Sequence, residues 1–485
     1  MSAGRLFLEA LRLDLDSLED LRRRIDAALR LEVGGFIFFG ADAADARTLA
    51  GEIHAAADYP LWLASDLERG AGQHLRGLTT FPPPAALARH PDAENAVRFA
   101  AKSTALEARG LGLNLALAPV LDLDVEARNP IVGTRSFGSD PAMVSALGRA
   151  WIEACQAEGV AACAKHFPGH GRTTGDSHAE LPRVDAPREA LEADLEPFRA
   201  ACREVACVMS AHVAYPALGG EGPATLEPAI LQDLLRNDLG FEGLVLTDAL
   251  NMSGVRERAE ADLAPEAAAL TAGCDLLLYP PDLAQAIAAV EKAADASEAI
   301  AGRLSASLEC SARVLDRFPA AWPGKAPAPS DTGPEALAIS IAAVWPTGEL
   351  PEWLDPAAPV RVATLWDDRE DPARPPFGAL FRRTLARAGW TVLPPGPADP
   401  DAPILVLVAS TPQAWKGTAD LTLTARAALE GILGAGRAVP VLFGHPRLLD
   451  DFDAPGLCAW ATEPAQEAAA AHRLDQLARR PRGAS

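Results

Sequence analysis

The sequence predicts an α/β protein in which a (β/α)8 barrel is followed by a smaller α/β domain. Through about residue 316, eight short apolar runs alternate with longer amphipathic stretches, a pattern typical of βα units around a parallel sheet. A segment rich in Pro and Gly then interrupts this periodicity. Three further apolar runs follow it, again separated by helical stretches.

The barrel prediction depends on the order of these elements. The expected strands are residues 6–10, 35–39, 61–65, 113–118, 160–165, 207–212, 244–247 and 275–279. The expected helices are residues 18–31, 46–57, 93–109, 142–158, 188–204, 227–237, 266–272, 283–294 and 297–317. Eight strands with interleaved helices fit a closed barrel better than an open sheet.

The second domain is expected after the Pro- and Gly-rich segment. We predict a barrel over residues 1–318, a linker over 319–336 and a C-terminal α/β domain over 337–485. Within that domain the expected strands are residues 360–365, 404–409 and 439–443, and the expected helices are 377–388 and 423–433.

The composition fits a folded protein that binds neither nucleic acid nor membranes. Of 485 residues 49% are hydrophobic, and acidic side chains outnumber basic ones by 66 to 44, giving a net charge of −22. Such a surface is not built to neutralise phosphates. The N-terminus lacks the basic and apolar regions of a signal peptide, and no run approaches the roughly 18 apolar residues of a membrane span. We therefore expect a cytoplasmic protein.

Four of the predicted strands end in polar residues. The C-terminal ends of the strands are where a barrel of this kind carries its chemistry. The polar residues are Ser65-Asp66, Lys165-His166, His212 and Thr247-Asp248. Each alone could be a rim hydrogen bond. Because the C-terminal ends of the strands converge on one mouth of the barrel, their coincidence predicts an active site there.

One segment, residues 164–182, is rich in groups that carry chemistry. It contains Lys-His-Phe-Pro-Gly-His-Gly and Asp-Ser-His, and with them three of the nine histidines. In an extended loop Asp176 and His178 can point to the same side, so the carboxylate can bond one imidazole nitrogen and leave the other as a general acid and base. Asp248, on a rigid strand end, suits nucleophilic attack on a carbon centre.

The segment Lys165-His-Phe-Pro-Gly-His-Gly...Asp176-Ser-His178, with Gly-Phe-Glu-Gly-Leu-Val-Leu-Thr-Asp248 downstream, resembles the family 3 glycoside hydrolases, and within them the NagZ-type β-N-acetylglucosaminidases. The resemblance covers residues 4–316. It implies a TIM-like barrel, no cofactor, and a retaining exo-enzyme that releases terminal GlcNAc from β-linked substrates such as muropeptide fragments in cell-wall recycling. The C-terminal part resembles, more weakly, the α/β sandwich-type domain of longer family members.

The resemblance also implies roles for single residues. Asp248 matches the nucleophile, His178 the acid/base and Asp176 its partner. The residues matched to sugar binding are Asp66, Arg135, Lys165 and His166, with His212 at the barrel mouth. A histidine acid/base repels an incoming anion less than a glutamate would, so phosphorolysis stays open as a variant reaction.

One segment departs from the family pattern. Family members commonly read Asp-x-Glu-Gly-Gly-Arg-Val followed by a further basic residue, whereas this chain reads Asp66-Leu-Glu-Arg-Gly-Ala-Gly-Gln-His74. Ala71 replaces the usual arginine, and His74 stands in place of the second basic residue. We expect the aglycone side of the site to differ and the hydrolytic core to be unchanged.

Three other interpretations were weighed. The first is a zinc hydrolase, whose ligands would come from His166, His170, Asp176, His178 and His212. The Pro-Gly pair between His166 and His170 prevents the helical presentation that metalloprotease motifs require. The seven cysteines are scattered and form no CxxC pair. We therefore expect no metal. The second is a β-glucosidase or β-xylosidase of the same family, whose acid/base is usually a glutamate outside the barrel. The third is a catalytically silent sugar-binding barrel, against which the intact Asp248, Asp176 and His178 argue.

Overall fold

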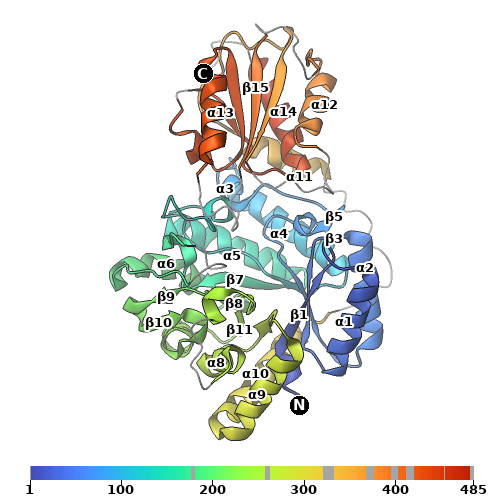
Figure 1. Cartoon of the computed structure of the whole chain (residues 1–485), viewed down its shortest axis with the longest axis vertical. Coiled ribbons are helices and arrows are strands. Elements are labelled where there is room, and N and C mark those ends of the chain that lie inside the picture. The colour runs from blue at the N-terminus through green and yellow to red at the C-terminus, as the bar shows by residue number, and fades with distance from the viewer. Residues whose placement is uncertain are drawn as a thin grey trace. The chain divides into compact units, whose positions relative to one another are not determined.

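The computed structural model describes residues 2–175, 181–256, 263–320, 333–367, 376–394, 402–410, 420–452 and 454–480. The chain divides into two compact units, each with its own sheet (Figure 1). The first, here called the barrel unit, consists of Met1–Thr79, Val97–Glu126 and Ser136–Asp331. The second, the sheet unit, consists of Thr80–Ala96, Ala127–Arg135 and Thr332–Ser485.

The barrel unit is built on eight parallel strands, which confirms the predicted barrel (Figure 1). Neighbouring strands follow the order of the chain, and the last strand pairs back with the first through Phe7 with Leu277 and Leu8 with Leu278. The strands are β1 (Phe7–Arg12), β2 (Gly35–Phe39), β4 (Trp62–Ser65), β6 (Leu115–Ala116), β7 (Ala161–Phe167), β8 (Cys207–Ser210), β11 (Leu244–Thr247) and β12 (Leu277–Leu278). Each of the eight strands lies within a predicted strand or differs from it by at most two residues at either end.

Helices separate these strands along the chain. They include α1 (Leu18–Arg30), α2 (Ala43–Ala56), α4 (Ala93–Gly110), α5 (Pro141–Ala157), α6 (Arg188–Ala201), α8 (Pro265–Ala272), α9 (Leu283–Ala296) and α10 (Glu298–Arg317). α1 begins where Ser17 Oγ accepts a hydrogen bond from the Asp20 amide at 3.2 Å, the usual role of a serine N-cap. The predicted helix at 227–237 is instead a π-helix, η7 (Ala229–Asp238). None of the described helices is long and apolar enough to cross a bilayer.

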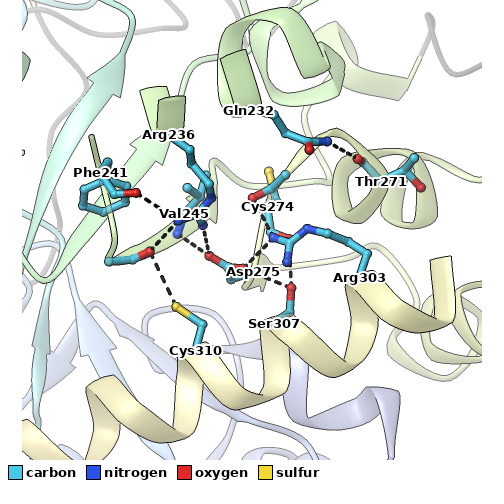
Figure 2. Close-up of polar contacts among 12 residues, drawn as sticks. Gln232, Arg236, Phe241, Val245, Thr271, Cys274, Asp275, Arg303, Ser307 and Cys310 are labelled. Carbon is cyan, nitrogen blue, oxygen red and sulfur yellow. Dashed lines mark hydrogen bonds and ion pairs between the residues drawn. The ribbon is translucent and has the colours of Figure 1, made fainter. Parts of the chain in front are cut away.

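β11 and β12 close the ring through the isolated bridge between Leu246 and Leu276. Asp275, which precedes β12 and is only 1% exposed, reinforces this junction (Figure 2). Four donors hold its carboxylate: Val245 N at 2.9 Å, Arg236 Nη2 at 2.5 Å, Arg303 Nη2 at 2.6 Å and Ser307 Oγ at 3.0 Å. A buried carboxylate between two guanidinium groups thus joins η7, β11, β12 and α10.

The interior of the barrel is filled by apolar side chains. Alternate strand residues such as Leu8, Ile37 and Leu246 belong to one core, and the end of α10 adds Leu315 and Phe318 to it. Trp62 Nε1 donates to Ser311 Oγ of α10 at 3.1 Å, so the indole nitrogen is satisfied. The polar residues that follow these strands therefore come directly after the apolar residues of this core.

The sheet unit contains a five-stranded sheet between helices (Figure 1). Its order is β13 (Trp345–Pro346), β17 (Leu457–Cys458), β16 (Ala438–Gly444), β15 (Ile404–Ser410) and β14 (Arg361–Trp366), with β13 antiparallel to β17 and the others parallel. Leu405 and Leu407 pack on the side of α12 (Ala379–Arg387) and α14 (Pro464–Ala478), whereas Val406 and Val408 pack on the side of α13 (Leu423–Gly434). The unit also contains α3 (Pro84–Leu87), η3 (Gly133–Arg135) and α11 (Gly333–Ala343). β14, β15 and β16 correspond to the three predicted strands.

Candidate active site

Five of the predicted site residues lie at the C-terminal ends of the barrel strands. Asp66 follows β4, Lys165 and His166 are in the last part of β7, His212 follows β8, and Asp248 follows β11. Parallel strands carry these side chains to the same end of the barrel, which is where barrels of this class carry their chemistry.

Lys165 is held by two carboxylates. Its Nζ lies 2.7 Å from Asp66 Oδ1 and 2.7 Å from Glu68 Oε1. The lysine and Glu68 side chains are 2% and 3% exposed, whereas Asp66 is 24% exposed. A buried ammonium group needs such pairing. Asp66 is thus the member of this trio that solvent, and hence a substrate hydroxyl, can reach.

His166 is held by Asp122, a carboxylate that our sequence analysis did not single out. Asp122 Oδ2 lies 2.6 Å from His166 Nδ1, and its Oδ1 accepts from the His166 amide at 3.1 Å and the His170 amide at 2.6 Å. Burial acts to raise the pKa of Asp122, but its interactions with His166 and His170, including these hydrogen bonds, outweigh burial and lower the pKa.

His212 has protein partners at both ring nitrogens. Nδ1 lies 2.8 Å from Thr225 Oγ1, and Nε2 lies 3.2 Å from the carbonyl oxygen of Ala249. Only a protonated Nε2 can bond a carbonyl, so Nε2 is the donor, and Nδ1 accepts from the hydroxyl in the neutral ring. Burial lowers the pKa of His212, which favours this neutral form. The histidine therefore supports the backbone directly after Asp248.

Asp248 is ionised at neutral pH. Its Oδ1 accepts a hydrogen bond from the Ala249 amide at 2.7 Å. Burial would raise the pKa of this carboxyl, but its interactions with His166, His212, that amide and Lys165 lower the pKa to about 2. The arrangement therefore presents a carboxylate anion on a strand end, stabilised by two imidazole rings, a backbone amide and a lysine.

His74 marks the segment that departs from the family pattern. Its ring packs edge-on against Phe39, with centroids 5.5 Å apart and an interplanar angle of 82°. Burial lowers the pKa of His74, although Asp66 and Glu68 act in the opposite direction. At this position the chain thus has a packed ring that burial disfavours as a cation. Ala71 is fully buried.

The three remaining predicted residues are Asp176, His178 and Arg135. Asp176 and His178 lie outside the described residues. Arg135 ends η3 in the sheet unit, where its Nη1 donates to the Ile131 carbonyl at 3.3 Å. Among the described residues no group of three or more His, Cys, Asp or Glu side chains is arranged to hold a metal ion.

Asp122 and Glu68 could have been found from the sequence. Asp122 follows the apolar run that contains β6, so it obeys the same rule that pointed to Asp66 and Asp248. It was missed because three residues separate it from the predicted strand end at 118. Glu68 was quoted as part of the Asp66 segment, but a single carboxylate gave no reason to pair it with a lysine ninety-seven positions later.

The family model for the glycosyl hydrolase family 3 N-terminal domain matches residues 18–315. A beta-hexosaminidase of Pseudomonas aeruginosa is 39% identical over 260 residues, which are 53% of this chain and 77% of that protein. A beta-hexosaminidase of Thiobacillus denitrificans is 39% identical over 309 residues, covering 60% of this chain and 82% of its own.

The fold has a counterpart among solved structures over both units. A glycoside hydrolase family 3 beta-N-acetylglucosaminidase from a Paenibacillus species superposes with a TM-score of 0.84 and 26% sequence identity. The match covers 98% of this chain and 96% of that one. The likeness thus includes the sheet unit, which lies largely beyond the segment that matches the family model.

Proposed function

This chain belongs to glycosyl hydrolase family 3, and we propose that it is a retaining exo-β-N-acetylglucosaminidase that releases terminal GlcNAc from β-linked substrates. The state of Asp248 carries the proposal: a carboxylate with a pKa of about 2 at the end of β11, beside Lys165 and His166. Relatives named as beta-hexosaminidases support the N-acetylated sugar.

In the first step Asp248 attacks the anomeric carbon. A bond forms between its Oδ and C1 while the bond between C1 and the glycosidic oxygen breaks, and that oxygen takes a proton from His178. In the second step His178 takes a proton from water, whose oxygen bonds C1 and displaces Asp248. Two inversions leave the β configuration unchanged. We assign Asp176 the role of orienting His178.

Sugar binding is assigned to the groups around Asp248. Asp66 is partly exposed, so its carboxylate can accept from hydroxyls far from the reacting carbon. Lys165 and His166 are assigned to hydroxyls nearer that carbon, and Arg135 to the substrate on the strength of the sequence match alone. His212 is assigned to supporting Asp248, because both its ring nitrogens are already bonded within the protein.

The natural substrate and its setting follow from the sequence prediction. We assign the enzyme to cytoplasmic muropeptide fragments in peptidoglycan recycling, with the aglycone contacts altered at Ala71 and His74. The catalytic domain would be residues 1–318, joined by a linker over 319–336 to a domain over 337–485.

The decisive experiment compares initial rates on an aryl β-N-acetylglucosaminide and the matching β-glucoside, at neutral pH without phosphate. We expect a clear preference for the N-acetyl sugar and a loss of at least about 1000-fold in Asp248→Asn, which removes the nucleophile at nearly constant shape. Equal or faster turnover of the glucoside would contradict the N-acetyl specificity. Turnover of neither substrate until phosphate is added would identify a phosphorylase.

The stereochemistry has its own test. Proton NMR of the first product formed should show β-GlcNAc, with the α anomer appearing later as the sugar mutarotates. First appearance of the α anomer would contradict the double displacement.

A further inference from the structure

Asp122 adjoins the candidate active site through hydrogen bonds from two histidines. Its side chain is fully buried, and its three hydrogen bonds come from the His166 ring, the His166 amide and the His170 amide, at 2.6 to 3.1 Å. An ionised carboxylate can only accept hydrogen bonds. The proton on the imidazole must therefore be at Nδ1, which leaves Nε2 of His166 as the atom available to a ligand.

The imidazole of His166 is the ionisable side chain that contacts Asp122 directly. Burial lowers the pKa of His170 to about 4, so that ring is neutral at pH 7. Arg172 is already paired with Asp194 at 2.5 Å. Asp122 therefore bonds the His166 ring, and its remaining hydrogen bonds come from backbone amides.

We propose that Asp122 is a positioning residue of this active site: it fixes the tautomer and orientation of His166, so that Nε2 of the ring is left for the substrate. The proposal rests on the proposed function for what Nε2 binds, and on the geometry alone for the tautomer and orientation of the ring. Asp122 itself does not touch the reacting atoms.

Other ionisable groups act on the same pair from the elements around it. On Asp122 these are His170, Asp194 and Tyr215, and on His166 they are His170, His212, Asp248 and the adjoining Lys165. Tyr215 Oη donates to the Gly169 carbonyl at 2.8 Å, and burial raises its pKa, so it stays neutral.

The chain offers a matched control for a buried carboxylate. Asp275 is 1% exposed and accepts from a backbone amide, two arginines and a serine, but it lies before β12, at the opposite ends of the strands (Figure 2). Asp122→Asn and Asp275→Asn make the same chemical change at similar burial. They differ in whether a histidine of the site depends on the carboxylate.

The first measurement is imidazole ¹⁵N NMR of the full chain without substrate, with the His166 signal assigned from His166→Gln. We expect the proton of the His166 ring to be at Nδ1 in the wild type and in Asp275→Asn, and this preference to be lost in Asp122→Asn. A wild-type ring whose Nδ1 carries no proton would overturn the proposal. This readout requires neither turnover nor a folded Asp122 variant, so it decides the proposal even if the enzyme acts on another substrate.

The second measurement is kinetic. Asp122→Asn should lower kcat/KM on the aryl β-N-acetylglucosaminide by about 10- to 100-fold, the range for a carboxylate that orients a functional histidine. Asp275→Asn should stay within about 2-fold while folded. In a His166→Ala background the Asp122 change should have almost no further effect, because both act through one ring. Independent, multiplying losses would show that Asp122 does not act through His166.

Discussion

At the residue scale, two partly buried carboxylates of the barrel have pKa values displaced in opposite directions. Interactions with His166, His212, the Ala249 amide and Lys165 lower the pKa of Asp248 to about 2. Burial raises the pKa of Glu9 in β1 to about 7; Arg24, 3.9 Å away, acts to lower it, and the like charge of Asp282 adds to the rise. Glu9 Oε2 is buried without a hydrogen-bond partner among the described residues. The first displacement fits the proposed nucleophile, whereas the second lowers stability as the pH rises.

Glu9→Gln should therefore stabilise the protein at high pH. Below about pH 4.5 the carboxyl is protonated in both folded and unfolded chains, so the substitution has little effect. As pH rises from 4.5 to 7, only the unfolded chain loses the proton and wild-type stability falls. We expect the variant to gain about 1–3 kcal/mol at pH 8 and almost nothing at pH 4, measured by urea unfolding.

A control at an exposed glutamate gives the comparison for this test. Glu52 pairs with Arg22 at 2.8 Å on the surface, and its pKa is lowered by that hydrogen bond. Glu52→Gln should produce no gain at either pH. A Glu9→Gln gain that does not grow between pH 4 and pH 8 would contradict a titrating Glu9.

At the element scale, the barrel depends on side chains where its ladder is weakest. β12 consists of Leu277–Leu278, and Asp275 supplements its junction with β11 through Arg236, Arg303 and the Val245 amide. Replacing this carboxylate leaves two partly buried guanidinium groups without their anion. We expect Asp275→Asn to lower the free energy of unfolding by about 3–5 kcal/mol in urea titrations.

The surface pair of Arg183 and Asp185 serves as the control for Asp275. These side chains are 46% and 72% exposed and lie 2.7 Å apart, so Asp185→Asn should change stability by less than about 1 kcal/mol. Equal effects of the two substitutions would show that the Asp275 cluster does not stabilise the junction.

The elements of the barrel could be predicted because buried parallel strands form apolar runs that Gly and polar residues bound. The short β13 and β17 could not, since Trp345–Pro346 and Leu457–Cys458 are too brief to show a period. α14 is rich in alanine, so its buried face is hard to distinguish from its exposed one. Within the site, strand ends pointed to Asp66 and Asp248, but the pairing of Lys165 with Glu68 is tertiary and no local pattern contains it.

At the scale of the whole molecule, the chain has two separate sets of core residues. The barrel core contains strand residues such as Leu246 together with the end of α10. The sheet unit has its own clusters on both faces of its sheet, with Leu407 fully buried in β15. Apart from Arg135, each described residue to which we assign a role in the reaction lies in the barrel unit.

Leu407→Ala should consequently separate stability from catalysis. Removing a fully buried leucine leaves a cavity, and we expect the free energy of unfolding of the sheet unit to fall by about 2–5 kcal/mol. Leu246→Ala, the same change in the barrel core, should destabilise by a similar amount and act on the unit that holds Asp248. The two variants thus compare one cavity in each unit.

The measurement is kcat and KM on the aryl β-N-acetylglucosaminide at a temperature where circular dichroism shows each variant folded. Leu407→Ala should keep both constants within about 2-fold of the wild type, because no described group assigned to the chemistry packs on β15. A Leu407→Ala protein that stays folded but loses turnover would show that the chemistry needs the sheet unit. In that case the search for an acid/base would extend to the glutamates of that unit, as the glucosidase alternative requires.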